Sequence, residues 1–505
     1  MVGARRAQAP WLLVYLSAPS HGNVPAPAWH AGVSLLDGWL PLTIQIAVGV
    51  LLVVVVGWRT RRWRTLWLPV AAGVGLLVAL LAMWYVNANA LATDPAPMSL
   101  WVWIGITAAA LAVAVLGWRG ARWWRRVLSV PAIPLGLLCT GLVLNQWVGY
   151  FPTVQEAWAQ ITAGPLPDQV DAAQLGALQG KGSTMTTGRL VGVNIPDTAS
   201  HFVHREEYVY LPPAWFTGAH HPRLPVLTMI GGEFNTPADW IRTGGAISTV
   251  DSYAKSHHGQ APILVFADSG GSFNNDTECV NGPRGNAADH LTEDLRPYVI
   301  SHFGASSAAA DWGVVGFSMG GTCAVDLAVM HPELFSSFED IAGDEGPIVG
   351  TKQLTIKELY GGSAAAWAKF DPLTVMAGHA RYTDTAGWFV NSSPGSEPGG
   401  RGKWGGPHAN GRGGTGGRQG GHRHGGSMTR PGPTGFGGRD IPGDGMGGQA
   451  ADAQKLCAAA GKKGISCTLH YQPEGHTWQL AAASFSEAFP WLAGHVHTPN
   501  APAGA

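Results

Sequence analysis

The sequence predicts two architectures in one chain, an all-α region of four transmembrane helices followed by an α/β domain with a mostly parallel sheet flanked by helices. Apolar stretches of about twenty residues with tryptophans near their ends predict the first part. A Gly-x-Ser-x-Gly segment between a strand-like run and a helix-like stretch predicts the second. The expected organisation is a tail over 1–36, the spans over 37–150, a linker over 151–187, the α/β domain over 188–495 and a tail over 496–505.

The composition agrees with a membrane part beside a soluble part. The 505 residues include 32 basic and 33 acidic side chains, only 13% are charged, and 22 are tryptophan. Such a balanced chain has no basic footprint for a nucleic acid, so none is expected as a partner.

Four apolar stretches in the first third are each long enough to cross a bilayer. One buried helix of a soluble protein can be this apolar, but four in a row favour membrane spans. Their polar residues are few, chiefly Gln45, Asn145 and Gln146, and no charged residue lies mid-span, so we interpret the region as an anchor rather than a transporter. The stretches are Trp39 to Gly57, Trp67 to Val86, Leu100 to Gly117 and Val127 to Val148.

Arginines predict the orientation of the spans, because cytoplasmic loops collect Lys and Arg. The loop over 87–99 has no basic residue and carries Asp94, whereas the loops before and after it are arginine-rich. A multi-pass protein of the cell membrane with an extracytoplasmic domain after Tyr150 is therefore expected. The arginines are Arg59, Arg61, Arg62 and Arg64 in one loop and Arg119, Arg122, Arg125 and Arg126 in the other.

The first 36 residues resemble a signal peptide only faintly. Arg5 and Arg6 precede an apolar run over 11–16, but this run is short and no good cleavage site follows. We expect an exposed tail, or a start codon assigned too far upstream.

Ser318 is the candidate nucleophile. It lies in Gly316–Gly320, between the apolar run Trp312 to Val315 and the helix-like stretch Gly321 to Met330. The two glycines let the backbone turn sharply enough to expose the serine hydroxyl, and they leave the Met319 N–H free to bind an oxyanion. Gly-x-Ser-x-Gly occurs by chance in glycine-rich chains, but the flanking strand and helix make this one specific, and they predict an acyl-enzyme.

His476 is the candidate base. It follows the strand-like run Ser466 to Tyr471, in the order serine, acid, histidine that this kind of site uses. The alternative is an ordinary loop histidine. Other late histidines fit worse, since they lie in that strand, in the C-terminal tail or in a glycine-rich tract: His470, His495, His497, His422 and His424.

Several carboxylates are candidates for the acid that would orient the histidine. Glu397 is the first choice, because it follows the strand-like run Gly387 to Asn391, after which the acid is expected. The alternatives follow the preceding strand-like run, Ser337 to Ala342, or lie in a glycine-rich insertion: Asp344 with its neighbours Asp340 and Glu345, then Asp440 and Asp444.

A second oxyanion donor is expected after the buried strand Leu224 to Ile230. There Gly231 and Gly232 are followed by Glu233 and Phe234, and the backbone N–H of either, together with that of Met319, would form the hole. The alternative is an ordinary strand-to-loop turn.

These motifs make the run from Gly188 to Leu492 resemble the putative-esterase family of α/β-hydrolases, which includes esterase D-like enzymes and the mycobacterial mycolyltransferases. The resemblance implies the α/β-hydrolase fold, a serine-histidine-acid triad and ester or acyl-transfer chemistry. The chain departs from the family in its glycine-rich insertion. The residues that carry the resemblance are Leu224 to Gly232, Ile263 to Asp268, Asp276 to Cys279, Gly316 to Gly321 and Gly475 to Trp478.

The insertion, about 392–449, has almost no aliphatic side chains and cannot bury a core. A flexible excursion is expected, and the alternative is a metal site at His408, His422 and His424. Of the five cysteines, Cys139 lies in the fourth span. The others could form two disulfides, with Cys457 and Cys467 the favoured pair; the rest are Cys279 and Cys323. No cysteine has zinc-ligand spacing, so neither a metal nor a cofactor is expected.

The combined prediction is a membrane-anchored, extracytoplasmic serine esterase or acyltransferase that acts on lipid or acyl-ester substrates of the cell envelope. The competing interpretation is a catalytically inactive hydrolase fold that serves as a surface binding or scaffold protein. A third possibility is that the spans themselves act on lipid. The oligomeric state is left open.

Overall fold

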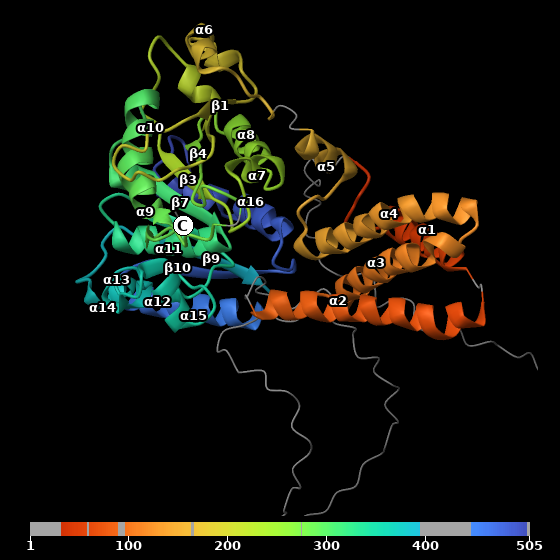
Figure 1. Ribbon diagram of the computed structural model, residues 1–505. Coiled ribbons are helices and arrows are strands. Elements are labelled where there is room, and N and C mark those ends of the chain that lie inside the picture. Colours follow the sequence, from red (N-terminus) through yellow and green to blue (C-terminus); the bar gives the residue numbers. More distant parts are fainter. Residues whose placement is uncertain are drawn as a thin grey trace, which may run out of the picture.

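The computed structural model describes residues 32–57, 60–88, 96–162, 166–273, 275–393 and 446–501. Figure 1 shows a helical bundle at the right and an α/β domain at the left, with helix α5 (Val154–Ile161) between them.

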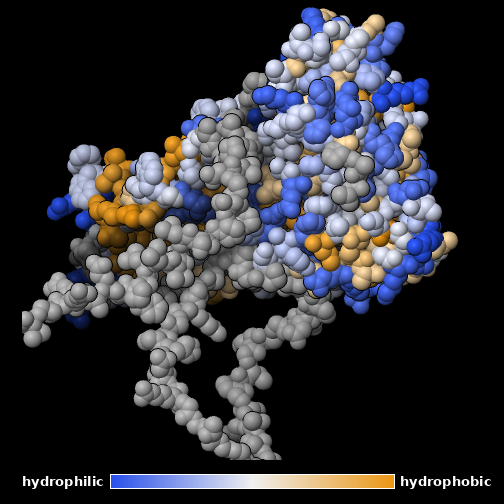
Figure 2. Space-filling model, turned by 180° about the vertical axis from the view of Figure 1, so that it is seen from behind, coloured by the Kyte–Doolittle hydropathy of each residue, from blue (hydrophilic) through white to orange (hydrophobic). Residues whose placement is uncertain are grey.

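The bundle contains four long apolar helices. The third and fourth begin earlier than predicted, and so does the second when the π-helical turn before it is included. The described residues hold four helices long and apolar enough to cross a membrane, and at most 33% of the best window of each is buried. Their side chains therefore point mostly outward, and Figure 2 shows the resulting apolar surface over the bundle. The helices are α1 (Trp39–Val56), α2 (Leu68–Ala88) after a π-helical turn (Trp63–Trp67), α3 (Met98–Gly117) and α4 (Trp123–Val148).

The start of α1 and the end of α4 meet at one end of the bundle. There the Gln146 side chain donates to the Leu36 carbonyl over 3.0 Å, and Ser34 pairs with Thr153. At the other end, Gly57 lies against the Arg125 guanidinium. The arginine-rich end thus lies away from the point where the chain enters the α/β domain.

The α/β domain is built on an eight-stranded sheet in the order β1-β2-β4-β3-β7-β8-β9-β10. β2 pairs antiparallel with both β1 and β4, and all other neighbours are parallel. The predicted α/β-hydrolase fold is confirmed. The strands are β1 (Arg189–Val193), β2 (Glu207–Leu211), β3 (Val226–Ile230), β4 (Ile263–Ala267), β7 (Trp312–Phe317), β8 (Ser337–Ile341), β9 (Ala386–Ser392) and β10 (Ser466–Gln472), with a small hairpin of β5 (Asn281–Gly282) and β6 (Gly285–Asn286) outside the sheet.

Helices cover both faces of the sheet, which is why its central parallel strands are buried along their whole length, while the edge strand β10 is partly exposed. One face packs against α7 (Pro237–Arg242), α8 (Ala246–Ser256) and α16 (Trp478–His495). The other packs against a π-helical segment (His290–Leu295), α11 (Met319–Met330), α14 (Pro372–Gly378) and α15 (Met446–Lys462). The remaining helices are α6 (Leu175–Leu178), α9 (Ala287–Asp289), α10 (Arg296–Phe303), α12 (Lys352–Tyr360) and α13 (Ala364–Trp367).

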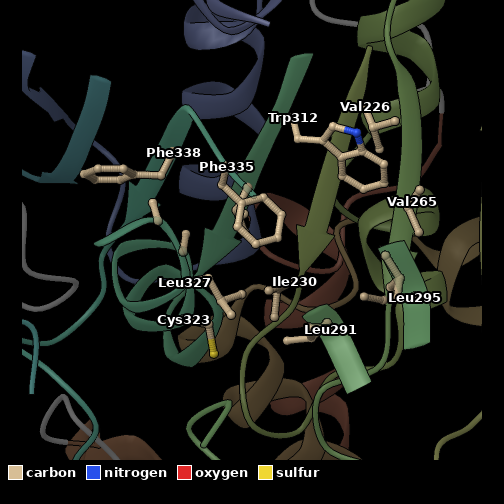
Figure 3. Packing of buried hydrophobic residues seen from close by; sticks show 14 of the residues in the cluster. Val226, Ile230, Val265, Leu291, Leu295, Trp312, Cys323, Leu327, Phe335 and Phe338 are labelled. Atoms are coloured by element: carbon tan, nitrogen blue, oxygen red, sulfur yellow. The ribbon is translucent and has the colours of Figure 1, made fainter. Parts of the chain in front are cut away.

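Figure 3 shows how the second face is filled. Cys323 and Leu327, both on α11, lie in one buried cluster with Phe335, Leu291 and Ile230. These contacts fix α11, and so the serine turn at its start, against the sheet.

Two disulfides form in the α/β domain. One joins Cys457 to Cys467, the pair favoured from the sequence, and the other joins Cys279 to Cys323. The second bond ties the loop after β4 to α11, the helix that begins at the serine turn.

Three segments differ from their predicted roles. The linker packs onto the domain from Leu166 onwards, and Gln169 pairs with Leu190 of β1. Beyond α16, Val496 and Thr498 are buried, so the chain still packs where a tail was expected. The last residues assigned to the insertion already form the first turn of α15.

Candidate active site

Ser318 occupies the turn between β7 and α11 with φ 59° and ψ −124°, a conformation that is costly for a residue with a Cβ. Its two flanking glycines make the turn possible. A Cβ on Gly316 would collide with the Gly320 carbonyl, and one on Gly320 would collide with the Ile230 carbonyl. The Ser318 N–H donates to the Ile341 carbonyl over 2.9 Å, which holds the turn above the sheet.

His476 lies on the loop between β10 and α16, with its Nε2 3.0 Å from Ser318 Oγ. The two side chains are 158 positions apart in the sequence, and the fold brings them into hydrogen-bond contact. The described surroundings of His476 hold no carboxylate against the ring, and their burial of it lowers its pKa to about 4. The imidazole is therefore neutral at neutral pH and can accept the serine proton.

Among the described residues, the hydrogen-bond partner of His476 Nδ1 is Gln449, an amide rather than a carboxylate. Gln449 Oε1 lies 3.1 Å away, so Nδ1 carries the proton and Nε2 is free to accept from the serine hydroxyl. The Gln449 amide donates onward to Asp344 Oδ1 over 3.4 Å. Gln449 can hold the imidazole in its working tautomer, but a neutral amide cannot stabilise the imidazolium that forms during catalysis.

The proposed acids have different positions. Glu397, Asp440 and Asp444 lie outside the described residues. Asp344 accepts from Gln449, which contacts the histidine, and Glu345 pairs with Lys455 over 2.5 Å. Asp340 is buried beneath the turn, where it accepts from the Gly343 N–H; this burial raises its pKa to about 7.

Sequence reasoning missed Gln449. It was assigned to the glycine-rich insertion, where low complexity hides individual residues. The available signal was the change from glycines to the alanine-rich, helix-like run that begins at this residue. The contact depends on the fold: β9 pairs with β10, and the first turn of α15, which precedes β10 in the chain, lies at the loop over 473–477, here called the histidine loop.

The loop after β3 lies over the serine, as the oxyanion prediction requires. A Cβ on Gly232 would lie 3.2 Å from Ser318 Cβ, and Asn235 Oδ1 accepts from the Gly232 N–H over 2.9 Å. Within the described residues, the backbone N–H groups of Met319, Glu233 and Phe234 have no hydrogen-bond acceptor. They are thus available to a developing negative charge.

One charged side chain hydrogen-bonds this loop, and another lies within it. Arg205 donates to the Asn235 carbonyl over 2.8 Å and forms an ion pair with Asp268 at 2.6 Å. The Glu233 carboxyl is half-buried, and burial, aided by Asp276, raises its pKa to about 7. The side chain of Glu233 is thus part neutral at neutral pH, which limits its repulsion of an oxyanion.

One group among the described residues has metal-ligand side chains close together, namely His204, Glu207 and His290. The two imidazoles are stacked, with ring centroids 4.5 Å apart and planes 24° apart. A metal bound by an imidazole lies in the plane of its ring, and two stacked rings have no nearby point common to both planes. Both nitrogens of His204 also face carbonyl oxygens, of Arg205 at 2.8 Å and Ile195 at 2.6 Å. This geometry does not fit a metal.

The same contacts fit a buried imidazolium, because both ring nitrogens must carry hydrogens to donate to carbonyls. Burial alone would lower the pKa of His204, but Glu207, the two carbonyl groups and Asp268 outweigh it and raise the pKa. Glu207 also accepts from His290 over 3.1 Å.

This cluster predicts a pH dependence of stability. The folded pKa of His204 is above its unfolded value of about 6.5, so its stabilisation is complete below that pH and is lost as the pH rises through the folded pKa. The difference in melting temperature between wild type and His204→Gln is therefore expected to be largest near pH 6 and to shrink at alkaline pH. A difference that is constant from pH 6 to 9 would contradict a charged His204.

Comparisons with known proteins give one family and several relatives. A family model described as putative esterase matches residues 204–386. An uncharacterized protein of Corynebacterium glutamicum is 27% identical over 376 residues, which cover 72% of this chain and 85% of the relative.

Two solved structures are similar at lower identity. An S-formylglutathione hydrolase from Agrobacterium tumefaciens is 17% identical, with 62% of this chain and 97% of that chain covered and a TM-score of 0.42. MPT51 from Mycobacterium tuberculosis is 14% identical, with 60% and 99% covered and a TM-score of 0.37. Similarity at this level says nothing of a substrate.

Proposed function

We propose that the protein is a serine hydrolase of carboxylic esters, on the premise that its residues 204–386 match the putative-esterase family. Ser318 attacks the ester carbonyl, His476 takes the serine proton and later returns it to the leaving alcohol, and Glu397 stabilises the imidazolium. The N–H groups of Met319 and of Glu233 or Phe234 bind the oxyanion. The observation that carries this proposal is the 3.0 Å contact between His476 Nε2 and Ser318 Oγ, made at a serine with φ 59°.

The acyl group can leave the serine in two ways. If water attacks the acyl-enzyme, the protein is an esterase; if an alcohol such as a sugar hydroxyl attacks it, the protein is an acyltransferase of the mycolyltransferase type. We propose lipids of the cell envelope as the acyl donors, because the domain follows four helices that are long and apolar enough to span a bilayer. The arginine-rich loops support an orientation with the α/β domain on the extracytoplasmic side.

The experiment that tests the proposal is labelling of the full-length protein, reconstituted in lipid nanodiscs, with a fluorophosphonate probe. We expect a single covalent adduct, mapped by peptide mass spectrometry to Ser318. The control for specificity is the variant Ser336→Ala, which should leave labelling unchanged. Ser336 lies just before β8, and its hydroxyl hydrogen-bonds backbone carbonyls. A folded wild-type protein that takes no label would reject the hydrolase and favour the binding module.

A further inference from the structure

The end of the fourth span contacts the two helices that directly follow the loops with the candidate catalytic groups. Gly149, one residue beyond α4, accepts a hydrogen bond from the Gln479 side chain over 3.0 Å. Tyr150 donates from its hydroxyl to Asp239 Oδ1 over 2.7 Å. Gln479 lies in the first turn of α16, three residues after His476. Asp239 lies in α7, directly after the loop over 231–236, here called the oxyanion loop.

The turn that presents Gly149 and Tyr150 is itself rigidly held. Asn145, buried in the last turn of α4, accepts from the Phe151 N–H at 2.6 Å through its side-chain oxygen and donates to the Phe151 carbonyl at 2.9 Å. Gly149 closes the helix with φ 69° and donates to the Asn145 carbonyl over 2.7 Å. Asn145, one of the few polar residues of this span, therefore serves this turn.

The contact to the histidine loop is close. A Cβ on Gly149 would collide with the Gln479 side chain and would lie 2.9 Å from Thr477 Cβ. Trp478, between these two residues, packs on Phe317 with ring centroids 5.2 Å apart, and Phe317 directly precedes the serine. The end of the span thus contacts the side chains of Thr477 and Gln479, which follow the histidine in the chain.

The contact to the oxyanion loop passes through Asp239, whose side chain is fully buried. Asp239 accepts from the Thr236 N–H over 2.7 Å, which fixes the junction between the oxyanion loop and α7. The next residue, Trp240, donates to the Ile230 carbonyl at the end of β3 and packs edge-on against Trp478 at 5.2 Å. The segments that follow both loops therefore pack against each other and against the end of the fourth span.

We propose that Gly149 and Tyr150, at the end of the fourth span, are positioning residues. They hold the histidine loop and the oxyanion loop in place relative to each other. The membrane region then contributes to the geometry of the site as well as to anchoring. This inference rests on the proposed function for its effect on rate, but not for its effect on loop structure. Misplacement of a catalytic group by about 1 Å can cost on the order of a hundredfold in rate.

The test uses full-length Tyr150→Phe in nanodiscs. Tyr208→Phe is a matched control, because Tyr208 packs on the same core cluster and also donates to a carboxylate, Glu206 at 2.8 Å, but lies on β2. Hydrogen–deuterium exchange should rise in peptides covering 232–240 and 474–480 for Tyr150→Phe and stay unchanged for Tyr208→Phe. Gln479→Glu, which cannot donate to the Gly149 carbonyl, should raise exchange in the second peptide.

The kinetic readout separates positioning from general destabilisation. With p-nitrophenyl butyrate, kcat of Tyr150→Phe should fall about tenfold while KM stays nearly unchanged, since orientation and not ester binding is lost. Exchange equal to that of the control would overturn the inference, whether or not the protein has esterase activity. If Tyr150→Phe raises exchange but the wild-type protein takes no fluorophosphonate label, the positioning role is retained and the proposed function is rejected.

Discussion

His476→Ala is expected to reduce kcat/KM for a soluble ester by on the order of 10⁴-fold or more, because no other described group can take the Ser318 proton. Fluorophosphonate labelling should fall with it, while the melting temperature changes little. The measurement is a paired assay of hydrolysis and labelling rate.

His470→Ala is the matched control for this prediction. His470 lies six residues earlier on β10, stacks on Trp388 with ring centroids 3.7 Å apart and lies 3.5 Å from Glu487, away from the serine. Its loss should leave both rates near the wild-type value. Equal losses in the two variants would mean that the effect is structural and that His476 is not the base.

Glu397→Gln is expected to reduce kcat/KM by about 10³-fold, because the imidazolium would lose its countercharge. The loss should be smaller than that of His476→Ala, since Gln449 still holds Nδ1 and so keeps the working tautomer.

The pH profile tests the same assignment. Without a carboxylate, burial holds the pKa of His476 at about 4, so the acid limb of kcat/KM should lie near pH 4 in Glu397→Gln. A carboxylate beside Nδ1 favours the imidazolium, so the wild-type limb should lie at higher pH.

Asp344→Asn separates the two candidate acids. If Asp344, which reaches His476 through Gln449, supplied the countercharge, this variant would show the large loss and the shifted limb, and Glu397→Gln would keep the wild-type profile. That outcome would make the Glu397 assignment wrong. Asp440→Asn and Asp444→Asn are expected to leave both rate and profile unchanged.

Local patterns in the sequence were enough to predict the four long apolar helices and the central strands. The helices follow from uninterrupted apolar length, and β7 from an apolar run that ends at the glycines of the serine turn. The strained turn could be foreseen as well, because only glycine tolerates the approach of the Gly320 and Ile230 carbonyls beside Ser318. Such features depend on neighbours within a few residues.

The chain's four long apolar helices and its α/β domain with a Gly-x-Ser-x-Gly turn could be predicted from the sequence, since these signals are local and periodic. No such signal predicted that Gln449 lies at His476, that His204 and His290 stack instead of sharing a metal, or that Tyr150 contacts Asp239. The first and the last of these contacts join residues that are 27 and 89 positions apart. The physical reason is that strand order and helix packing bring such residues together, and neither leaves a periodic pattern in the chain.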